Sequence, residues 1–154
     1  MEKIESIKIL DKKNVQYRLI ELSERGISFE DVVKYSKKKI TPKEICKTII
    51  VRDKNGNKYA FFLKGDEKID FSKAKSIIGK KISIVGYDDL IKTTKTEPGA
   101  ICPLLLKDIP LFVDKKIFET EKINFGSGDH LHGLEINTKD LDKIIKFKIV
   151  SIAQ

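Results

Sequence analysis

The residue with the clearest chemical potential is Lys47, which lies in a run of apolar and β-branched residues spanning 45–51. Such a run is typical of a β-strand, in which Lys47 would share one face with Ile45, Ile49 and Val51. Neither face is polar, so the strand is expected inside a sheet rather than at its edge. Because burying a lone ammonium is costly, Lys47 is either a strand-end lysine that reaches the surface or a cation at the rim of a pocket.

A second group of residues that could do chemistry lies in segment 98–103, which we interpret as a loop because it holds two prolines and Gly99. Cys102 lies in this loop, but no base accompanies it in the sequence, so a small buried side chain is expected. A glycine and a proline four residues apart are ordinary in loops. Gly99 and Pro103 therefore gain a functional meaning only from their context.

Both histidines of the chain occur in segment 129–132, in the pattern Asp129-His130-Leu131-His132. Histidine and carboxylate side chains bind zinc, and Glu135 would be a further donor. Two histidines without a clear third ligand make a weak site, so no metal is predicted. A glycine-containing turn whose polar side chains line a pocket is expected instead.

Short helices and strands must position these residues. Helices are expected at 4–10, after an N-cap at Ser28, from Asp70 or Ser72 to 79, from 88, and from 137. Strands are expected at 15–22, 45–51, 58–64, 81–85, 109–113, from 123, at 134–136 and at 147–152, with a hairpin turn at Asn55-Gly56. The pattern predicts one domain, residues 1–154, of the α+β class with a mixed, largely antiparallel sheet flanked by short helices.

The composition is that of a highly charged globular chain of 154 residues, 40% hydrophobic and 35% charged. No segment approaches the ~18 consecutive apolar residues that a membrane-spanning helix needs, so no membrane contact is expected. Residues 1–5 mix charged and apolar side chains, unlike a secretory signal. The two cysteines are far apart and form no CxxC pair, which indicates a reduced, cytoplasmic protein.

The charge balance favours polyanionic partners. Lysine and arginine outnumber aspartate and glutamate by 31 to 23, which gives a net charge of +8. Most of the basic residues are lysines spread along the chain, with clusters at 37–39 and 115–116. This pattern suits attraction to a phosphate backbone better than base-specific recognition. A lysine-rich surface is also a feature of thermophilic proteins.

Five short motifs occur in one order along most of the chain, from about residue 17 onwards. They are Lys47-Thr48 before an apolar strand, Gly65-Asp66 after the hairpin, Gly99-x-x-x-Pro103, Val113-Asp114, and Gly126-x-Gly128 ahead of Leu141. Together they resemble the YbaK/prolyl-tRNA-synthetase-associated editing domain, a family of aminoacyl-tRNA deacylases. For the fold, the resemblance implies a sheet that curves towards a barrel.

For function, the resemblance implies a free-standing enzyme that hydrolyses the ester joining a wrong amino acid to the terminal adenosine of a tRNA. It implies no cofactor, the 3′ acceptor end of an aminoacylated tRNA as partner, and an aminoacyl-tRNA synthetase as a second partner. Lys47, Gly99 and Pro103 match the family's catalytic lysine and pocket loop. The residues expected to contact the substrate are Thr48, Ala100, Ile101, Gly126, Gly128, Asp129 and His130.

The expected chemistry is electrostatic. An unperturbed lysine is an ammonium at neutral pH and a poor base, so Lys47 would hold the terminal phosphate or ribose. Backbone N–H groups near Gly99, Ala100 and Ile101 could receive the developing oxyanion. The resemblance also implies that the ribose hydroxyl beside the ester helps to activate water, and His130 could orient the water or the substrate's amino group.

The sequence leaves the substrate open among cysteine, alanine, serine and threonine esters, often of tRNA for proline, because one methylene is worth only ~1–3 kcal/mol of discrimination. Lys47-Thr48 favours the cysteine-editing branch over the alanine-specific one. Two alternatives from other classes remain. One is a non-catalytic basic RNA-binding module, and the other is a metal-dependent hydrolase centred on His130 and His132.

Overall fold

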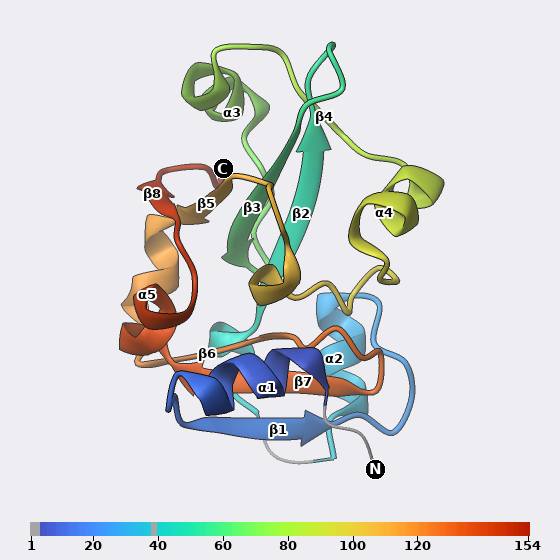
Figure 1. The fold of residues 1–154 in the computed structure, drawn as a ribbon, viewed down its shortest axis with the longest axis vertical. Helices are drawn as coiled ribbons and strands as arrows, with labels where there is room; N and C mark the ends of the chain where they lie inside the picture. Colours follow the sequence, from blue (N-terminus) through green and yellow to red (C-terminus); the bar gives the residue numbers. More distant parts are fainter. Residues whose placement is uncertain (1–3, 38–39) are drawn as a thin grey trace.

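The computed structural model describes residues 4–37 and 40–154, which contain eight strands and five α-helices (Figure 1). The strands are β1 Tyr17–Glu21, β2 Cys46–Arg52, β3 Lys58–Lys64, β4 Ser83–Ile84, β5 Leu111–Asp114, β6 Lys122–Gly126, β7 His132–Asn137 and β8 Lys148–Val150. The α-helices are α1 Glu5–Lys12, α2 Phe29–Tyr35, α3 Phe71–Ile78, α4 Tyr87–Thr94 and α5 Leu141–Ile144. Short 3₁₀ turns are η1 Pro42–Glu44, η2 Pro103–Leu105, η3 Lys115–Glu119 and η4 Thr138–Asp140. None of the helices in this described part of the chain has the length and apolarity needed to cross a membrane.

The strands form two sheets. One is antiparallel with the order β1-β7-β6, and the other has the order β4-β2-β3-β5-β8. In the larger sheet β4, β2 and β3 are antiparallel, whereas β5 runs parallel to β3 and to β8. The predicted α+β class with mixed strand pairing is therefore confirmed. The expected single sheet is instead divided in two and does not close into a barrel, because the outer strands β4 and β8 end the larger sheet without pairing to each other.

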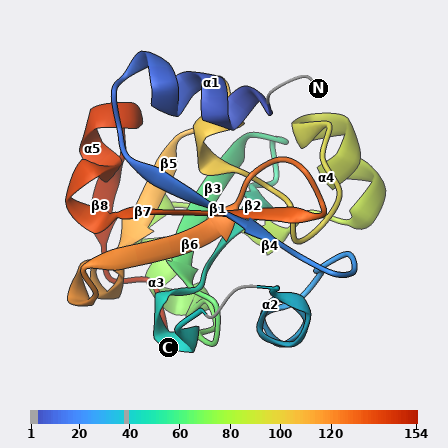
Figure 2. The ribbon, with the colours of Figure 1, turned by 90° about the horizontal axis from the view of Figure 1, so that it is seen from below.

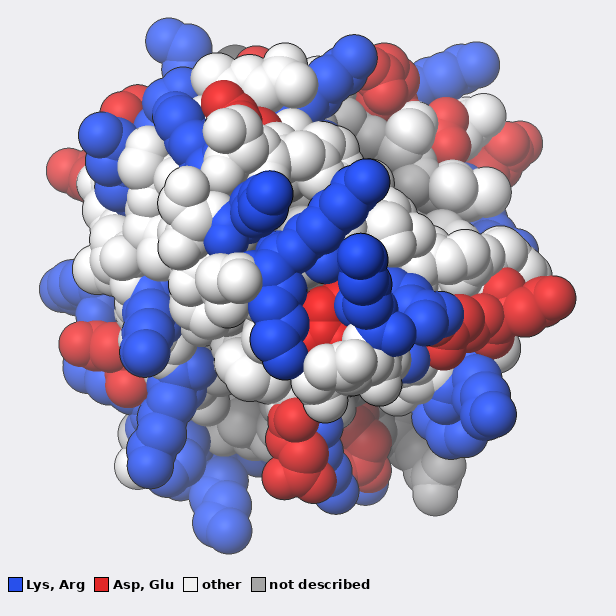
Figure 3. Space-filling view, turned by 90° about the horizontal axis from the view of Figure 1, so that it is seen from above, with Lys and Arg blue, Asp and Glu red and all other residues white. Residues whose placement is uncertain are grey.

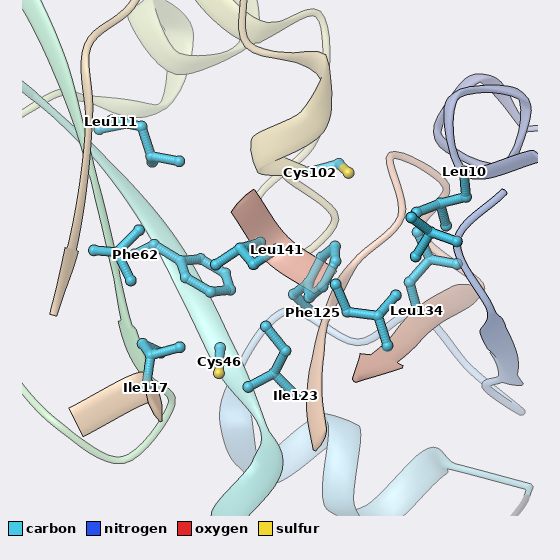
Figure 4. Packing of buried hydrophobic residues seen from close by; sticks show 14 of the residues in the cluster. Leu10, Cys46, Phe62, Cys102, Leu111, Ile117, Ile123, Phe125, Leu134 and Leu141 are labelled. Carbon is cyan, nitrogen blue, oxygen red and sulfur yellow. The ribbon is translucent and has the colours of Figure 1, made fainter. Parts of the chain in front are cut away.

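The smaller sheet lies across the end of the larger sheet at which β2 begins (Figures 1 and 2). A bridge between Ile45 and Asn124 of β6 joins the two sheets at this point. The main core fills the space between the sheets, where the rings of Phe62 and Phe125 meet edge to face at 5.7 Å (Figure 4). A second cluster lies on the other face of the larger sheet, where Phe61 packs with residues of α3 such as Ala74. Phe61 and Phe62 point to opposite faces because side chains alternate along β3.

Several predicted helix and turn signals are confirmed. The hydroxyl of Ser28 accepts a hydrogen bond from the N–H of Asp31, and Asp70 accepts from Ser72 at 3.0 Å, so both residues are N-caps. Asp53, before the predicted Asn-Gly turn, accepts hydrogen bonds from two backbone N–H groups of the hairpin. The strand expected at 81–85 is reduced to two residues, which pair only with Val51 and Arg52.

Candidate functional site

A cavity of about 450 Å³, called here the main cavity, lies beside the first half of β2. β4 pairs only with Val51 and Arg52, and the N–H of Val85 donates to the carbonyl of Ile50, so no strand continues the sheet beside residues 46–49. Four other segments close this space instead. The cavity is lined by Ile27, Ser28, Phe29, Glu30 and Val32 of the α2 region, Ile45 to Ile49, Gly65 to Lys68 after β3, Gly99 and Ile101 of the loop before η2, and Gly126 at the end of β6.

Lys47 lies in the wall of the main cavity and is half-buried. Burial lowers the pKa of Lys47, whereas the carboxylates of Asp66 and Glu30 act in the opposite direction. Within the described part of the chain no carboxylate is close enough to Lys47 to form an ion pair. The ammonium is therefore a cation at a cavity wall without a fixed counter-ion, as the pocket hypothesis expects.

Two glycines allow three segments to meet at the cavity. Gly99 has a φ of +86°, and a Cβ atom there would lie 2.3 Å from the carbonyl oxygen of Gly26. A Cβ atom on Gly126 would lie 2.6 Å from the carbonyl oxygen of Ile101. Real Cβ atoms do not approach so closely, so larger side chains at both positions would push the loop away from its neighbours. The loop is also held by a hydrogen bond of 2.8 Å from the N–H of Gly128 to the carbonyl of Ala100.

A polar cluster fixes the start of this loop. The carboxylate of Glu97 accepts a hydrogen bond from the Tyr87 hydroxyl and another from the Arg25 guanidinium, each at 2.6 Å. These hydrogen bonds, from Tyr87 first and then Arg25, lower the pKa of Glu97. Because Arg25 precedes the Gly26–Ile27 segment that packs on Gly99, the cluster joins two walls of the main cavity.

A second hollow of about 30 Å³, called here the small cavity, shares Val32, Ile45, Cys46, Gly99 and Gly126 with the main cavity. Its polar lining comes from Asn124, Asp129, His130 and His132. A carboxylate oxygen of Asp129 is hydrogen-bonded to Nδ1 of His132, whereas His130 is 52% exposed. Among residues 4–37 and 40–154, no group of three or more His, Cys, Asp or Glu side chains is placed to hold a metal ion.

Most of the residues expected at the site lie at one of the two cavities. Lys47, Thr48, Gly99, Ile101 and Gly126 line the main cavity, and Asp129 and His130 line the small one. Ala100 is buried behind the wall, and its N–H donates to the carbonyl of Glu97 at 3.2 Å, so it is not available for an oxyanion.

Pro103 and Gly128 line neither cavity. Pro103 is the first residue of η2, where its missing N–H costs nothing, and Gly128 packs against the side chain of Leu105. Burial raises the pKa of the Cys46 and Cys102 thiols to about 12, which makes both poor nucleophiles. This agrees with the expectation of a small buried side chain at Cys102.

Sequence reasoning missed the acidic side of the main cavity, formed by Glu30, Asp66 and Glu67, together with Phe29 and Lys68. Gly65-Asp66 is one of the five sequence motifs, and this signal is sufficient to place Asp66 at the site. Glu30 shows only the ordinary pattern of an acidic residue in the first turn of a helix.

The fold and the cavity define an α+β domain whose main cavity is lined by two lysines, Lys47 and Lys68, and by the glycine-containing segments of Gly99 and Gly126. Solved structures share this fold: one of a hypothetical protein, APE2540, has a TM-score of 0.87 at 21% identity and covers 97% of this chain and 100% of its own. Another, described as a candidate trans-editing enzyme for prolyl tRNA synthetase, has a TM-score of 0.81 at 14% identity, with 99% of both chains covered.

The chain belongs to the aminoacyl-tRNA editing domain family, whose model matches residues 27–144. Proline–tRNA ligases from two strains of Staphylococcus epidermidis are 26% identical to it over 116 residues. That match covers 73% of this chain and 20% of each ligase, so the chain spans about a fifth of the length of these relatives. The matched region contains both cavities apart from Ile20 and Leu22.

Proposed function

We propose that this protein is a trans-editing aminoacyl-tRNA deacylase, which hydrolyses the ester between a mischarged amino acid and the terminal adenosine of a tRNA. Membership of the editing domain family supports the reaction class. The observation that carries the proposal is the position of Lys47, whose half-buried ammonium faces the main cavity opposite the Gly99 loop. The family and its prolyl-tRNA relatives also support an aminoacyl-tRNA synthetase as partner and a place of action in the cytoplasm.

The size and charge of the main cavity suit an aminoacyl-adenosine. Its volume of about 450 Å³ lies within the ~300–1,000 Å³ range of ligand pockets. Such a ligand carries a negative phosphate on one side and a positive α-ammonium on the other. Lys47 and Lys68 provide cations for the first, and Glu30 and Asp66 provide carboxylates for the second.

In this mechanism Lys47 binds and orients the phosphate or ribose and does not abstract a proton. A fixed cation in a partly dry cavity stabilises charge more strongly than it would in water. Of the N–H groups considered for the oxyanion, those of Gly99 and Ile101 remain as donors, because Ala100 is already bonded to Glu97. Orientation of a labile ester towards water would then supply much of the acceleration.

The outer surface offers a polyanion-binding face. Figure 3 shows lysine and arginine side chains gathered at the centre of the face that carries the tip of the β2–β3 hairpin. Arg52, Lys54 and Lys81 line a hollow there, and within the described residues none of them forms an ion pair. The nearby carboxylate of Asp53 is occupied by the hairpin turn, and that of Asp89 pairs with a lysine at 3.2 Å. We expect this face to attract the tRNA phosphate backbone. Of the basic cluster predicted at 37–39, Lys38 and Lys39 lie outside the described residues.

The decisive experiment incubates a panel of mischarged tRNAs with wild type and with Lys47→Ala. We expect hydrolysis of at least one ester by wild type and a loss of about 100-fold or more for Lys47→Ala, the scale seen when one charge-stabilising group is removed. The matched control is Lys75→Ala, which removes an exposed lysine of α3 and should leave the rate unchanged.

Three results would contradict the proposal, and two of them would favour one of the alternatives. Full activity of a folded Lys47→Ala would remove the role of the lysine. Salt-dependent RNA binding without hydrolysis of any ester would favour the non-catalytic RNA-binding module. Loss of wild-type activity on addition of a chelator would favour a metal-dependent hydrolase.

A further inference from the structure

The small cavity has room for a water molecule. Its volume of about 30 Å³ exceeds the ~10–15 Å³ that a cavity needs to hold one. It lies directly behind the main cavity, since five residues belong to the walls of both. A water molecule held here would be a neighbour of a ligand bound in the main cavity.

Asn124 adds a polar amide to the wall of this cavity. The residue lies in β6 and is only 4% exposed. Its side-chain amide is not among the fully enclosed atoms that lack a partner in the described residues, so it is open to the space of the cavity. Buried polar groups almost always find a partner, and a bound water is the usual one when no protein group is present.

Gly133 keeps this space open on the opposite side. A Cβ atom at Gly133 would lie 3.0 Å from the amide oxygen of Asn124, which is closer than most real contacts of this kind. The glycine therefore leaves room beside the Asn124 amide that a larger side chain would take.

His132 provides a base at the same cavity. An ionised carboxylate can only accept hydrogen bonds, so the bond between Asp129 and Nδ1 of His132 places the ring proton on Nδ1. Nε2 is then the ring nitrogen that can accept a proton. The turn is fixed as well, because the N–H of His132 donates to the carbonyl of Asp129 at 3.1 Å and the hydroxyl of Ser127 donates to the carbonyl of His132 at 2.7 Å.

We propose that the small cavity holds the nucleophilic water of the deacylation and that His132, oriented by Asp129, is its general base. The inference rests on the proposed function. The water oxygen forms a bond with the ester carbonyl carbon while His132 Nε2 takes a proton from the water. The bond from that carbon to the ribose oxygen then breaks, and the imidazolium returns the proton to the leaving oxygen. The products are the free amino acid and a terminal adenosine with its hydroxyl restored.

The test measures single-turnover deacylation of the best ester from the mischarged tRNA panel by His132→Ala and His130→Ala, each with and without added imidazole. We expect His132→Ala to lower the rate by about 100-fold or more, as for other general bases. Imidazole should restore at least about tenfold of that loss by occupying the vacated space, and it should not accelerate His130→Ala. The mischarged tRNA with imidazole and no protein gives the rate at which free imidazole hydrolyses the ester unaided, and this rate is subtracted.

A rate for His132→Ala within about threefold of wild type would overturn the inference, and so would a loss that imidazole does not repair. If His132→Ala does not fold, Asp129→Asn keeps the shape of the turn and should still lower the rate by at least about tenfold because the ring loses its fixed tautomer. An Asp129→Asn rate equal to wild type would then count against the dyad. Failure of wild type to hydrolyse any ester refutes the proposed function, whereas an active wild type with an active His132→Ala refutes only the role of His132.

Discussion

Replacement of Gly126 by alanine tests how closely the cavity walls depend on one missing side chain. The added Cβ would lie 2.6 Å from the carbonyl oxygen of Ile101 and 2.8 Å from the carbonyl carbon of Ala100. Both contacts are with backbone atoms, so no side-chain rotation can relieve them. The segment carrying Ala100 and Ile101 must move instead, and with it one wall of both cavities.

The stability cost follows from overpacking a filled site, which is about 1–3 kcal/mol. For a chain of this size each kcal/mol lowers the melting temperature by roughly 2–4 °C, so a decrease of roughly 2–12 °C is expected. Deacylation should fall more steeply, because a displacement of about 1 Å at an active site can cost about 100-fold in rate. Thermal unfolding followed by circular dichroism and single-turnover hydrolysis of a mischarged tRNA measure the two effects.

Gly86→Ala is the matched control. It introduces the same methyl group at a position with φ −73°, where nothing lies within 4 Å of the added atom. Gly86 is the N-cap of α4, so a small stability cost is expected without a loss of deacylation. The reasoning would be refuted if Gly126→Ala kept the melting temperature and rate of wild type, or if Gly86→Ala lost as much activity.

Three further predictions rest on single features. Gly99→Ala should lose more stability than Gly126→Ala. The alanine would have to adopt the left-handed φ of +86°, and its Cβ would also lie 2.3 Å from a carbonyl oxygen. A smaller drop in melting temperature than that of Gly126→Ala would contradict this prediction. Cys46 and Cys102, with thiol pKa values raised to about 12 by burial, should resist iodoacetamide at pH 8 until the protein unfolds, which mass spectrometry can follow. Burial raises the pKa of Asp53, but the hydrogen bonds from the hairpin have the larger, opposite effect. The net result is a pKa lowered from 3.8 to about 2. Its stabilisation is present above about pH 4 and lost as the pH falls towards 2, so Asp53→Asn should be less stable at pH 7 and show a smaller loss between these pH values.

The local signals around Lys47 were sufficient to predict its strand. Alternating β-branched residues and the Asn55-Gly56 turn depend on near neighbours, and β2 spans Cys46–Arg52 with β3 as its hairpin partner, as expected. The predicted interior position of this strand agrees with the strand order of the larger sheet, in which β2 lies between β4 and β3. β4 pairs only with Val51 and Arg52 of β2. This pairing joins residues about thirty positions apart in the chain, and no local sequence pattern specifies it.

The same distinction separates the predictable from the unpredictable parts of the site. Gly99 and Gly126 are predicted at the site only through an ordered motif set. The close packing of Gly99 on the Gly26-Ile27 backbone and of Gly126 on the Ala100-Ile101 backbone depends on the tertiary fold. Glu30 lines the main cavity because the fold brings α2 and residues 45–49 to the same hollow. His132 was considered only as a metal ligand. Its bond to Asp129 spans three residues of a tight turn, so the spacing alone could have suggested the pair.

The last residues of the chain are neighbours of the rim of the main cavity. Ala153 forms a bridge with Ile69, and the N–H of Gln154 donates to the carbonyl of Lys68 at 2.9 Å, directly after the acidic segment that lines the cavity. The buried carboxylate of Asp114 accepts hydrogen bonds from the N–H groups of Ile152 and Ala153 and so secures this closure. Since ribosomes make proteins from the N-terminus onwards, a nascent chain would already display Lys47 and Asp66 while the residues that brace them are still in the exit tunnel. This part of the cavity rim would then be complete only after residues 152–154 have also emerged from the ribosome.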